Sequence, residues 1–147
     1  MSRKPADGER SATIGYRAQY LVGASLVLDA LDGRDLEWIK IADPNIGRVD
    51  DLQIATTARV DAFQVKWEQY PEAISFNDLT KENNSAPSLF AQLVDGWQRL
   101  KKLYPSKRVV VHLVTNQNPS STGGILPNII SPPKPYHFAA FVFFTAG

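Results

Sequence analysis

The chain has 147 residues, of which 44% are hydrophobic and 10% aromatic, and it contains no cysteine. This composition indicates one folded domain with a core and excludes an intrinsically disordered chain. The absence of cysteine excludes disulfides, thiolate nucleophiles and cysteine-ligated metal sites. Because the formal net charge is only +1, any attraction to nucleic acid has to come from local clusters of basic residues.

The first ten residues are polar and charged and lack the apolar region of a signal peptide. No segment is apolar for long enough to cross a bilayer. We therefore expect a cytoplasmic protein with no membrane partner.

The hydrophobic pattern of the first half predicts one helix followed by three strands. Ile14, Ala18, Leu21, Val22, Ser25 and Leu28 fall near one helical face, which we expect to pack on the core. In chain order we predict a helix over about Ile14–Leu31 capped by Ser11 or Thr13, a strand over Leu36–Ile41, a turn over 43–47, and a hairpin over about Val49–Trp67 that turns at Thr56–Arg59.

The second half predicts one more helix and one more strand. The helix runs from Pro87 or Ser88 to about Tyr104 and is stopped by Pro105. The apolar run within Arg108–Asn116 predicts a strand that is buried on both faces. The order helix, three strands, helix, strand indicates an α/β fold with a mixed sheet of about four strands flanked by helices.

The composition divides the chain into three parts. Residues 1–118 form the predicted core, and residues 119–135 are rich in Pro, Gly and Ser, as in a long loop or a linker. Residues 136–147 are apolar again. They either pack on the core or begin a module that this chain lacks, and we favour the first alternative.

The predicted hairpin carries the residues that most clearly indicate a metal-binding or catalytic site. Asp51 begins its first strand, and Gln64 and Lys66 lie two residues apart on the second, so these two project from the same side. A carboxylate, an amide oxygen and the Val65 carbonyl can hold Mg²⁺, and the lysine can orient a water or stabilise charge on a phosphate. Asp50 is a second candidate acid, and Asp43 lies nearby.

Each of these residues also has a purely structural interpretation. Asp50 and Asp51 can be solvated acids ahead of a strand, and Lys66 can simply face solvent. His112, inside an apolar strand, fits a hydrogen-bonded core residue better than a catalytic one. His112 and His137 do not have metal-ligand spacing.

Basic residues gather where the second helix ends. Positive charge at this position stabilises the helix dipole, which suffices as a structural explanation. The functional alternative is a patch that binds DNA phosphates without reading sequence. The residues are Arg99, Lys101, Lys102, Lys107 and Arg108.

The order and spacing of several short motifs resemble the restriction-endonuclease-like superfamily, the PD-(D/E)xK nucleases. Within that superfamily, the chain resembles the nuclease domain at the N-terminus of bacterial anti-phage effectors, including CBASS effectors and STAND-type antiviral ATPases. It spans roughly Ile14 to Asn118 and rests on Gly15-Tyr16-Arg17-Ala18-Gln19, Val49-Asp50-Asp51-Leu52-Gln53-Ile54, Phe63-Gln64-Val65-Lys66, Asn77-Asp78-Leu79, Gln92-Leu93, Gly96-Trp97 and Leu113-Val114-Thr115-Asn116.

The resemblance implies a restriction-endonuclease-like core and a role for each matching residue. Asp51 matches the metal-binding acid, Lys66 the catalytic lysine, and Gln19 a helix glutamine near the active site. Gln64 stands where the superfamily more often has Glu, which removes one negative charge from the metal site. The implied activity is Mg²⁺-dependent cleavage of double-stranded DNA, with Mn²⁺ as a substitute metal, in a homo-oligomer or a larger effector protein.

The alternative function is a catalytically inactive nucleic-acid-binding or oligomerisation module on the same fold. In that interpretation Gln64 marks a lost site, and the segment Phe138–Phe144 makes a subunit or domain contact. This alternative predicts no Mg²⁺ binding and a dimer or larger species in solution.

Overall fold

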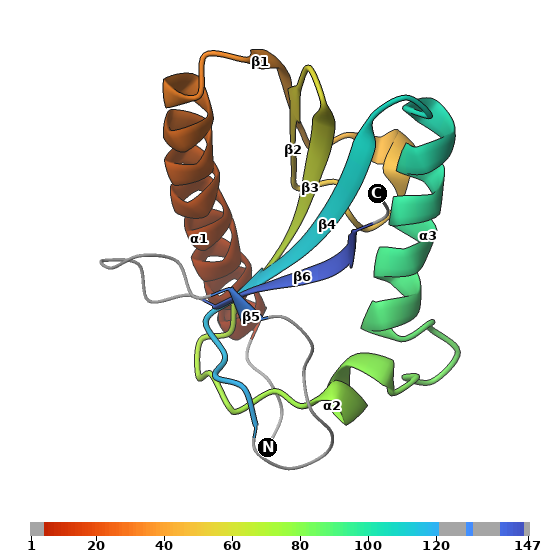
Figure 1. The fold of residues 1–147 in the computed structure, drawn as a ribbon. Helices are drawn as coiled ribbons and strands as arrows, with labels where there is room; N and C mark the ends of the chain where they lie inside the picture. The colour runs from red at the N-terminus through yellow and green to blue at the C-terminus, as the bar shows by residue number, and fades with distance from the viewer. Residues whose placement is uncertain (1–4, 121–128, 131–138, 146–147) are drawn as a thin grey trace.

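The computed structural model describes residues 5–120, 129–130 and 139–145. These residues form three layers, with a helix on each side of a central sheet (Figure 1). The long helix α1 (Pro5–Asp32) covers one face of the sheet, and α3 (Leu89–Leu103) covers the other. The structure therefore confirms an α/β fold with a mixed sheet between helices.

The sheet has the strand order β1-β2-β3-β4-β6-β5. Strands β3 and β4 pair in parallel, and the other neighbouring strands pair antiparallel. The strands are β1 (Leu36–Ile41), β2 (Leu52–Thr56), β3 (Arg59–Lys66), β4 (Arg108–Thr115), β5 (Ile129–Ile130) and β6 (Ala139–Thr145).

The shorter helical elements begin at polar caps. Asp43 accepts a hydrogen bond from the Asn45 N–H at the start of the 3₁₀ helix η1 (Pro44–Ile46). Ser75 and Asp78 form a reciprocal capping box on α2 (Phe76–Thr80). Ser88 caps α3, as the sequence predicted.

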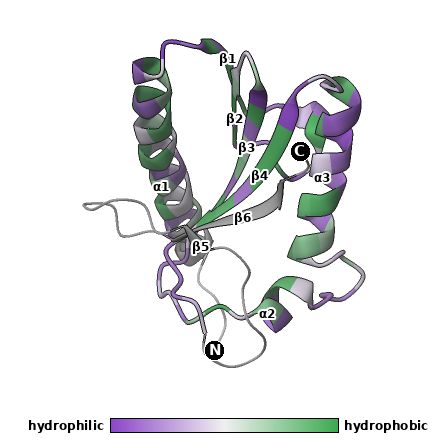
Figure 2. Ribbon diagram, viewed as in Figure 1, coloured by the Kyte–Doolittle hydropathy of each residue, from purple (hydrophilic) through white to green (hydrophobic). Residues whose placement is uncertain are grey.

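Strand alternation divides the core into two apolar clusters, one on each side of the sheet. Figure 2 shows hydrophobic residues along β4, and hydrophobic and hydrophilic residues interleaved along α1 and α3. In β3, Val60 and Ala62 join the cluster under α3, whereas Phe63 joins the cluster under α1. Strand β4 contributes Val111 to the first cluster and Val114 to the second, so this strand is buried on both faces. The sheet is thus held from both sides.

The hairpin and α3 lie close to their predicted positions, but α1 begins much earlier than predicted. It starts at Pro5 rather than near Ile14, so Ser11 and Thr13 lie inside the helix and do not cap it. The Thr13 hydroxyl donates to the Glu9 carbonyl one turn earlier. Periodicity missed this first part because its residues are mostly polar, although their helix propensity is adequate and Pro5 suits a first turn.

The packing face of α1 also differs from the prediction. Ala18 and Val22 are buried, but Leu21 and Leu28, which we expected on the same face, are each 64% exposed. The helix is rotated so that Val22 and Leu26 meet the sheet. Apolar residues of this helix fall on two stripes, and the pattern alone does not show which stripe faces the core.

The C-terminal segment adds to the sheet. Strand β6 pairs with β4, and β5, which falls inside the predicted loop 119–135, pairs with β6. Residues 121–128 and 131–138, which include His137, lie outside the described residues. No helix among the described residues combines the length and apolar character that a membrane span requires.

Candidate active site

Strand pairing brings Asp51 to Gln64. The two-residue connection between β2 and β3 fixes an antiparallel register in which Leu52 lies opposite Phe63. Continuing this register by one residue places Asp51 opposite Gln64. The carbonyl of Asp51 also accepts a hydrogen bond from the Ala42 N–H after β1. This bond holds the Asp51 backbone in place just before β2 begins.

The Asp51 carboxylate accepts hydrogen bonds from two elements. Gln19 of α1 donates to Oδ1 at 2.5 Å. On the other oxygen, Oδ2, the Gln64 amide and the Val65 N–H both donate at 2.7 Å. The structure therefore unites the predicted residues Asp51, Gln64 and Gln19 around one half-buried carboxylate.

The electrostatics of Asp51 are set mainly by desolvation. Burial raises its pKa from 3.8 to about 6, and the neighbouring Asp50 charge acts in the same direction. Hydrogen bonds from the Val65 N–H and from Gln64 oppose this rise. A carboxylate with a raised pKa at a sheet edge is typical of functional sites as well as of strained structural ones.

The amide oxygen of Gln64 provides a test of whether a cation fits. Gln64 Oε1 is buried and has no hydrogen-bond partner, which is a costly state for a polar atom. Oxygen and nitrogen of an amide are assigned from the hydrogen-bond network, so the group can also present its oxygen to Asp51. A carboxylate and an amide oxygen are suitable ligands for Mg²⁺, which usually keeps several waters.

The rest of the predicted metal set is sparse. Among the described residues, no three His, Cys, Asp or Glu side chains gather as a metal-binding group. It is the N–H of Val65 that contacts Asp51, so its carbonyl as a ligand remains a prediction. A cation here would therefore be held by one carboxylate, one amide and water.

Lys66 lies beyond this cluster. It projects from the same side of β3 as Gln64, and its side chain is 46% exposed. Its Nζ lies 3.9 Å from Glu68 Oε1, so it contacts Glu68 and not Asp51. The structure therefore places Lys66 on the same face as Gln64 but does not bring its ammonium group into contact with Asp51.

The second candidate acids have different environments. Asp50 is partly exposed, and its carbonyl accepts the Asp43 N–H. The Asp43 carboxylate accepts hydrogen bonds from the Asn45 N–H and the Gln53 amide, and it forms an ion pair with Lys40. Its pKa is lowered, first by the Asn45 N–H, so it serves as a helix cap.

A cavity of about 230 Å³ opens beside Asp51, between α1 and the first two strands. The sequence alone did not reveal it, because its walls come from segments far apart in the chain. Its lining is mostly apolar apart from Gln19 and Asp51, and comprises Gln19, Tyr20, Gly23, Ala24, Val27, Ile41, Asp51 and Leu52.

The predicted basic patch lies toward the other end of the sheet. Arg108 pairs with Arg59 in the β3–β4 register, whereas Gln64 pairs with Leu113. Five strand residues separate these positions, a distance of about 16 Å. The structure therefore does not bring the patch together with Asp51.

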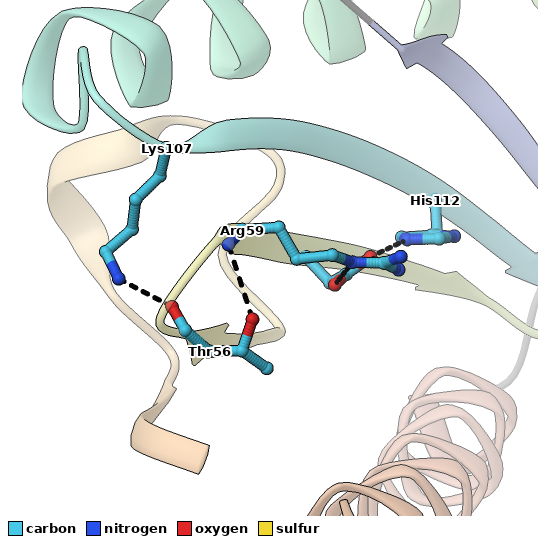
Figure 3. A network of polar contacts seen from close by, with 5 residues as sticks. Thr56, Arg59, Lys107 and His112 are labelled. Atoms are coloured by element: carbon cyan, nitrogen blue, oxygen red, sulfur yellow. Dashed lines mark hydrogen bonds and ion pairs between the residues drawn. The ribbon is translucent and has the colours of Figure 1, made fainter. Parts of the chain in front are cut away.

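Two members of the patch are bound to other protein groups. Lys107 contacts Glu37 and donates to the Thr56 and Thr57 carbonyls, so it fastens the β2–β3 turn (Figure 3). Arg99 pairs with Asp95 one turn earlier on α3. Lys102 and Arg108 are exposed, and Lys101 is partly exposed.

A second polar network, centred on Asp61, was not predicted. Arg59 donates to Asp61 at 2.5 and 2.6 Å, and His112 Nε2 lies 2.6 Å from Asp61 Oδ1 (Figure 3). Burial raises the pKa of Asp61, but the hydrogen bonds and charges of His112 and Arg59 together outweigh burial and hold it below its usual value. His112 also stacks on Phe63, so it is tied into the sheet.

Comparisons with protein-family models, with curated proteins and with solved structures find no match to this chain. The functional conclusion therefore depends on the residues around Asp51 and on their geometry.

Proposed function

We propose that this chain is a Mg²⁺-dependent DNA endonuclease domain with a PD-(D/E)xK-type site on a restriction-endonuclease-like core. The observation that carries the proposal is the direct contact of Asp51 with Gln64, 2.7 Å between Oδ2 and Nε2, with Lys66 two residues further along the same face. The biological role that we propose is that of an effector in bacterial anti-phage defence. Its substrate is double-stranded DNA, cut with little sequence preference.

The residues divide the chemistry among them. Asp51 and the Gln64 oxygen would hold Mg²⁺, which supplies a Lewis acid for the phosphate and a more acidic water. Lys66, which is 46% exposed, would orient the attacking water or stabilise the charge that develops on the phosphate. Gln19 holds the Asp51 carboxylate in place from α1.

The basic residues contribute to binding rather than to chemistry. Lys102 and Arg108 are exposed, and Arg108 lies about 16 Å from the site along the sheet. Duplex DNA is long enough to contact both regions. Such contacts would weaken with salt and carry no sequence information.

Plasmid cleavage tests the proposal. Supercoiled DNA is incubated with the chain in Mg²⁺, Mn²⁺ or EDTA, over a wide range of protein concentration. We expect nicking and linearisation with either metal and none in EDTA. Asp51→Ala and Lys66→Ala should each reduce the rate by about 100-fold or more, as loss of a catalytic group does.

The matched control is Lys81→Ala, which removes an exposed lysine at the end of α2. It should cut like the wild type. Cleavage by Asp51→Ala and Lys66→Ala at the wild-type rate would contradict the site assignment.

One observation favours a second candidate, the catalytically inactive module. Gln64 is neutral, and its amide donates to Asp51 as if no cation were needed. This candidate predicts that neither metal supports cleavage and that Gln64→Glu does not create it. Stronger cleavage by Gln64→Glu than by the wild type would instead indicate an active site limited by metal affinity.

A further inference from the structure

The helix α1 carries a second apolar stripe that does not face the sheet. Tyr20, Leu21, Leu28 and Leu31 are 69%, 64%, 64% and 56% exposed. A helix that covers one side of a sheet normally has one apolar stripe and a polar opposite face. The outer stripe of α1 is therefore a surface that lacks a partner among the described residues.

Three leucines of this stripe, Leu21, Leu28 and Leu31, belong to a seam with the spacing of a helix pair. The seam positions follow one another at intervals of three and four residues, the pattern of a and d positions in a coiled coil. They are Ile14, Arg17, Leu21, Ala24, Leu28 and Leu31. From its first member to its last, the seam extends over about 25 Å along the helix.

Charge along the seam favours antiparallel self-pairing. Arg17 belongs to its first half, Arg10 precedes its first member on the same side of the helix, and Asp32 follows its last member; all three are exposed. Glu9 is also exposed but lies about 100° around the helix from Arg10. A parallel pair would place Arg17 against Arg17, whereas an antiparallel pair places Asp32 between the two arginines of the other helix.

The side-chain sizes also match an antiparallel pair. In that register Leu21 of one helix lies against Ala24 of the other, Ile14 against Leu31, and Arg17 against Leu28. The small Ala24 leaves room for the leucine. The contact is isologous, because the same surface is used by both copies.

We propose that two copies of this chain associate through antiparallel pairing of their α1 helices along this seam. The proposal does not rest on the nuclease assignment, since none of the seam residues is a proposed metal ligand or catalytic group. Two of the residues that line the cavity, Tyr20 and Ala24, border or belong to the seam, so the dimer contact adjoins the candidate site.

Sedimentation equilibrium of the chain tests the association, over roughly 1 to 200 µM because dimer formation depends on concentration. We expect a dimer in the upper part of this range. Leu28→Lys should raise the dimer dissociation constant by about tenfold or more. Because the side chain is exposed, circular dichroism should be unchanged, and so should the melting temperature at concentrations where the wild type is monomeric. The control Leu103→Lys alters an equally exposed leucine of α3, 57% exposed, and should leave the dimer intact.

Cross-linking tests the direction of pairing, and the absence of native cysteine makes it clean. An oxidised mixture of Ile14→Cys and Leu31→Cys chains should yield the mixed disulfide dimer. Ile14→Cys alone should not cross-link, because its two copies would lie about 25 Å apart along the helices. A disulfide between two Ile14→Cys chains would overturn the antiparallel arrangement.

Charge exchange provides a second check of direction. Arg17→Asp and Asp32→Arg should each weaken the dimer, and the double variant should recover much of the loss. A monomer at every concentration, or a dimer unaffected by Leu28→Lys, would overturn the proposal. In the first case the seam is instead covered by another protein or domain.

Discussion

At the scale of single residues, the pKa values of two carboxylates, Asp51 and Asp61, are shifted in opposite directions. Asp61 is ringed by Arg59 and His112, and its pKa lies below the usual value despite burial. Asp51 has only neutral donors, so burial dominates and raises its pKa to about 6. The negative charge of Asp61 is thus compensated by Arg59 and His112 within the fold. Among the described residues Asp51 has no such partner, so its negative charge can be compensated by a bound cation.

Because of its raised pKa, the ionised Asp51 carboxylate lowers the free energy of unfolding of the metal-free protein. Its folded pKa of about 6 exceeds the unfolded value near 3.8, so between these values the folded state binds more protons. Stability from this group is present below pH 4 and is lost as pH rises through 6. Asp51→Asn should remove this decrease in unfolding free energy with rising pH, because asparagine does not titrate.

Urea denaturation of wild type and Asp51→Asn in EDTA, at pH 4 and pH 7.5, measures the effect. The difference in unfolding free energy should move in favour of the variant by about 1 kcal/mol between the two pH values, after allowance for solvent screening. Comparing the difference cancels the other titrating groups. Parallel pH curves for the two proteins would contradict the raised pKa.

At the scale of elements, α3 approaches the segment before β2 through a glycine. Gly96 is buried, and a Cβ at this position would overlap Val49 Cγ2 and lie 3.2 Å from the Ile46 carbonyl oxygen. Ile46 and Val49 are fully buried beneath α3. This contact fixes the chain that leads directly to Asp50 and Asp51.

Gly96→Ala should therefore destabilise the protein, although alanine is the better helix former. Overpacking of this kind costs about 1–3 kcal/mol, and we expect a lower melting temperature by calorimetry. The control is Gly15→Ala on α1, where nothing lies within 4 Å of the added atom. That variant should gain about 0.5–1 kcal/mol from helix propensity; a Gly96→Ala protein as stable as wild type would contradict the close contact.

Local patterns predicted the elements best. The two-residue turn and the alternating apolar residues identified the hairpin, and Ser88 with Pro105 bounded α3, because these signals act over a few residues. The start of α1 was missed because a polar helical segment has no hydrophobic period. Its packing face was predicted only in part: Ala18 and Val22 are buried, but Leu21 and Leu28 are exposed. Two apolar stripes compete on this helix, and only tertiary packing selects one.

At the scale of the whole molecule, the site was predictable as far as strand pairing determines it. The hairpin register alone brings Asp51 to Gln64. The contact from Gln19 spans 32 residues, and only the family resemblance suggested it. The ties from Lys107 to the β2–β3 turn were not predicted, because a basic residue after a helix gives no sign of the carbonyl groups it will meet.

The architecture separates stability from chemistry. The parallel β3–β4 pair, buried on both faces, and the Asp61 network hold the centre of the sheet. The candidate site lies where β2 begins and β3 approaches its end, beside α1. Its unpaired Gln64 oxygen and raised Asp51 pKa are tolerated there because the surrounding pairing holds both residues in place.

The central claim is that Asp51 and Gln64 form one cation site, and metal binding tests it independently of DNA. Electron paramagnetic resonance of free Mn²⁺ would be followed during titration with wild type, Asp51→Asn, Gln64→Ala and Lys66→Ala. We predict that the wild type and Lys66→Ala bind Mn²⁺ alike, that Gln64→Ala binds more weakly, and that Asp51→Asn loses the site. Equal binding by Asp51→Asn and wild type, or no binding by any of the four proteins, would contradict the claim.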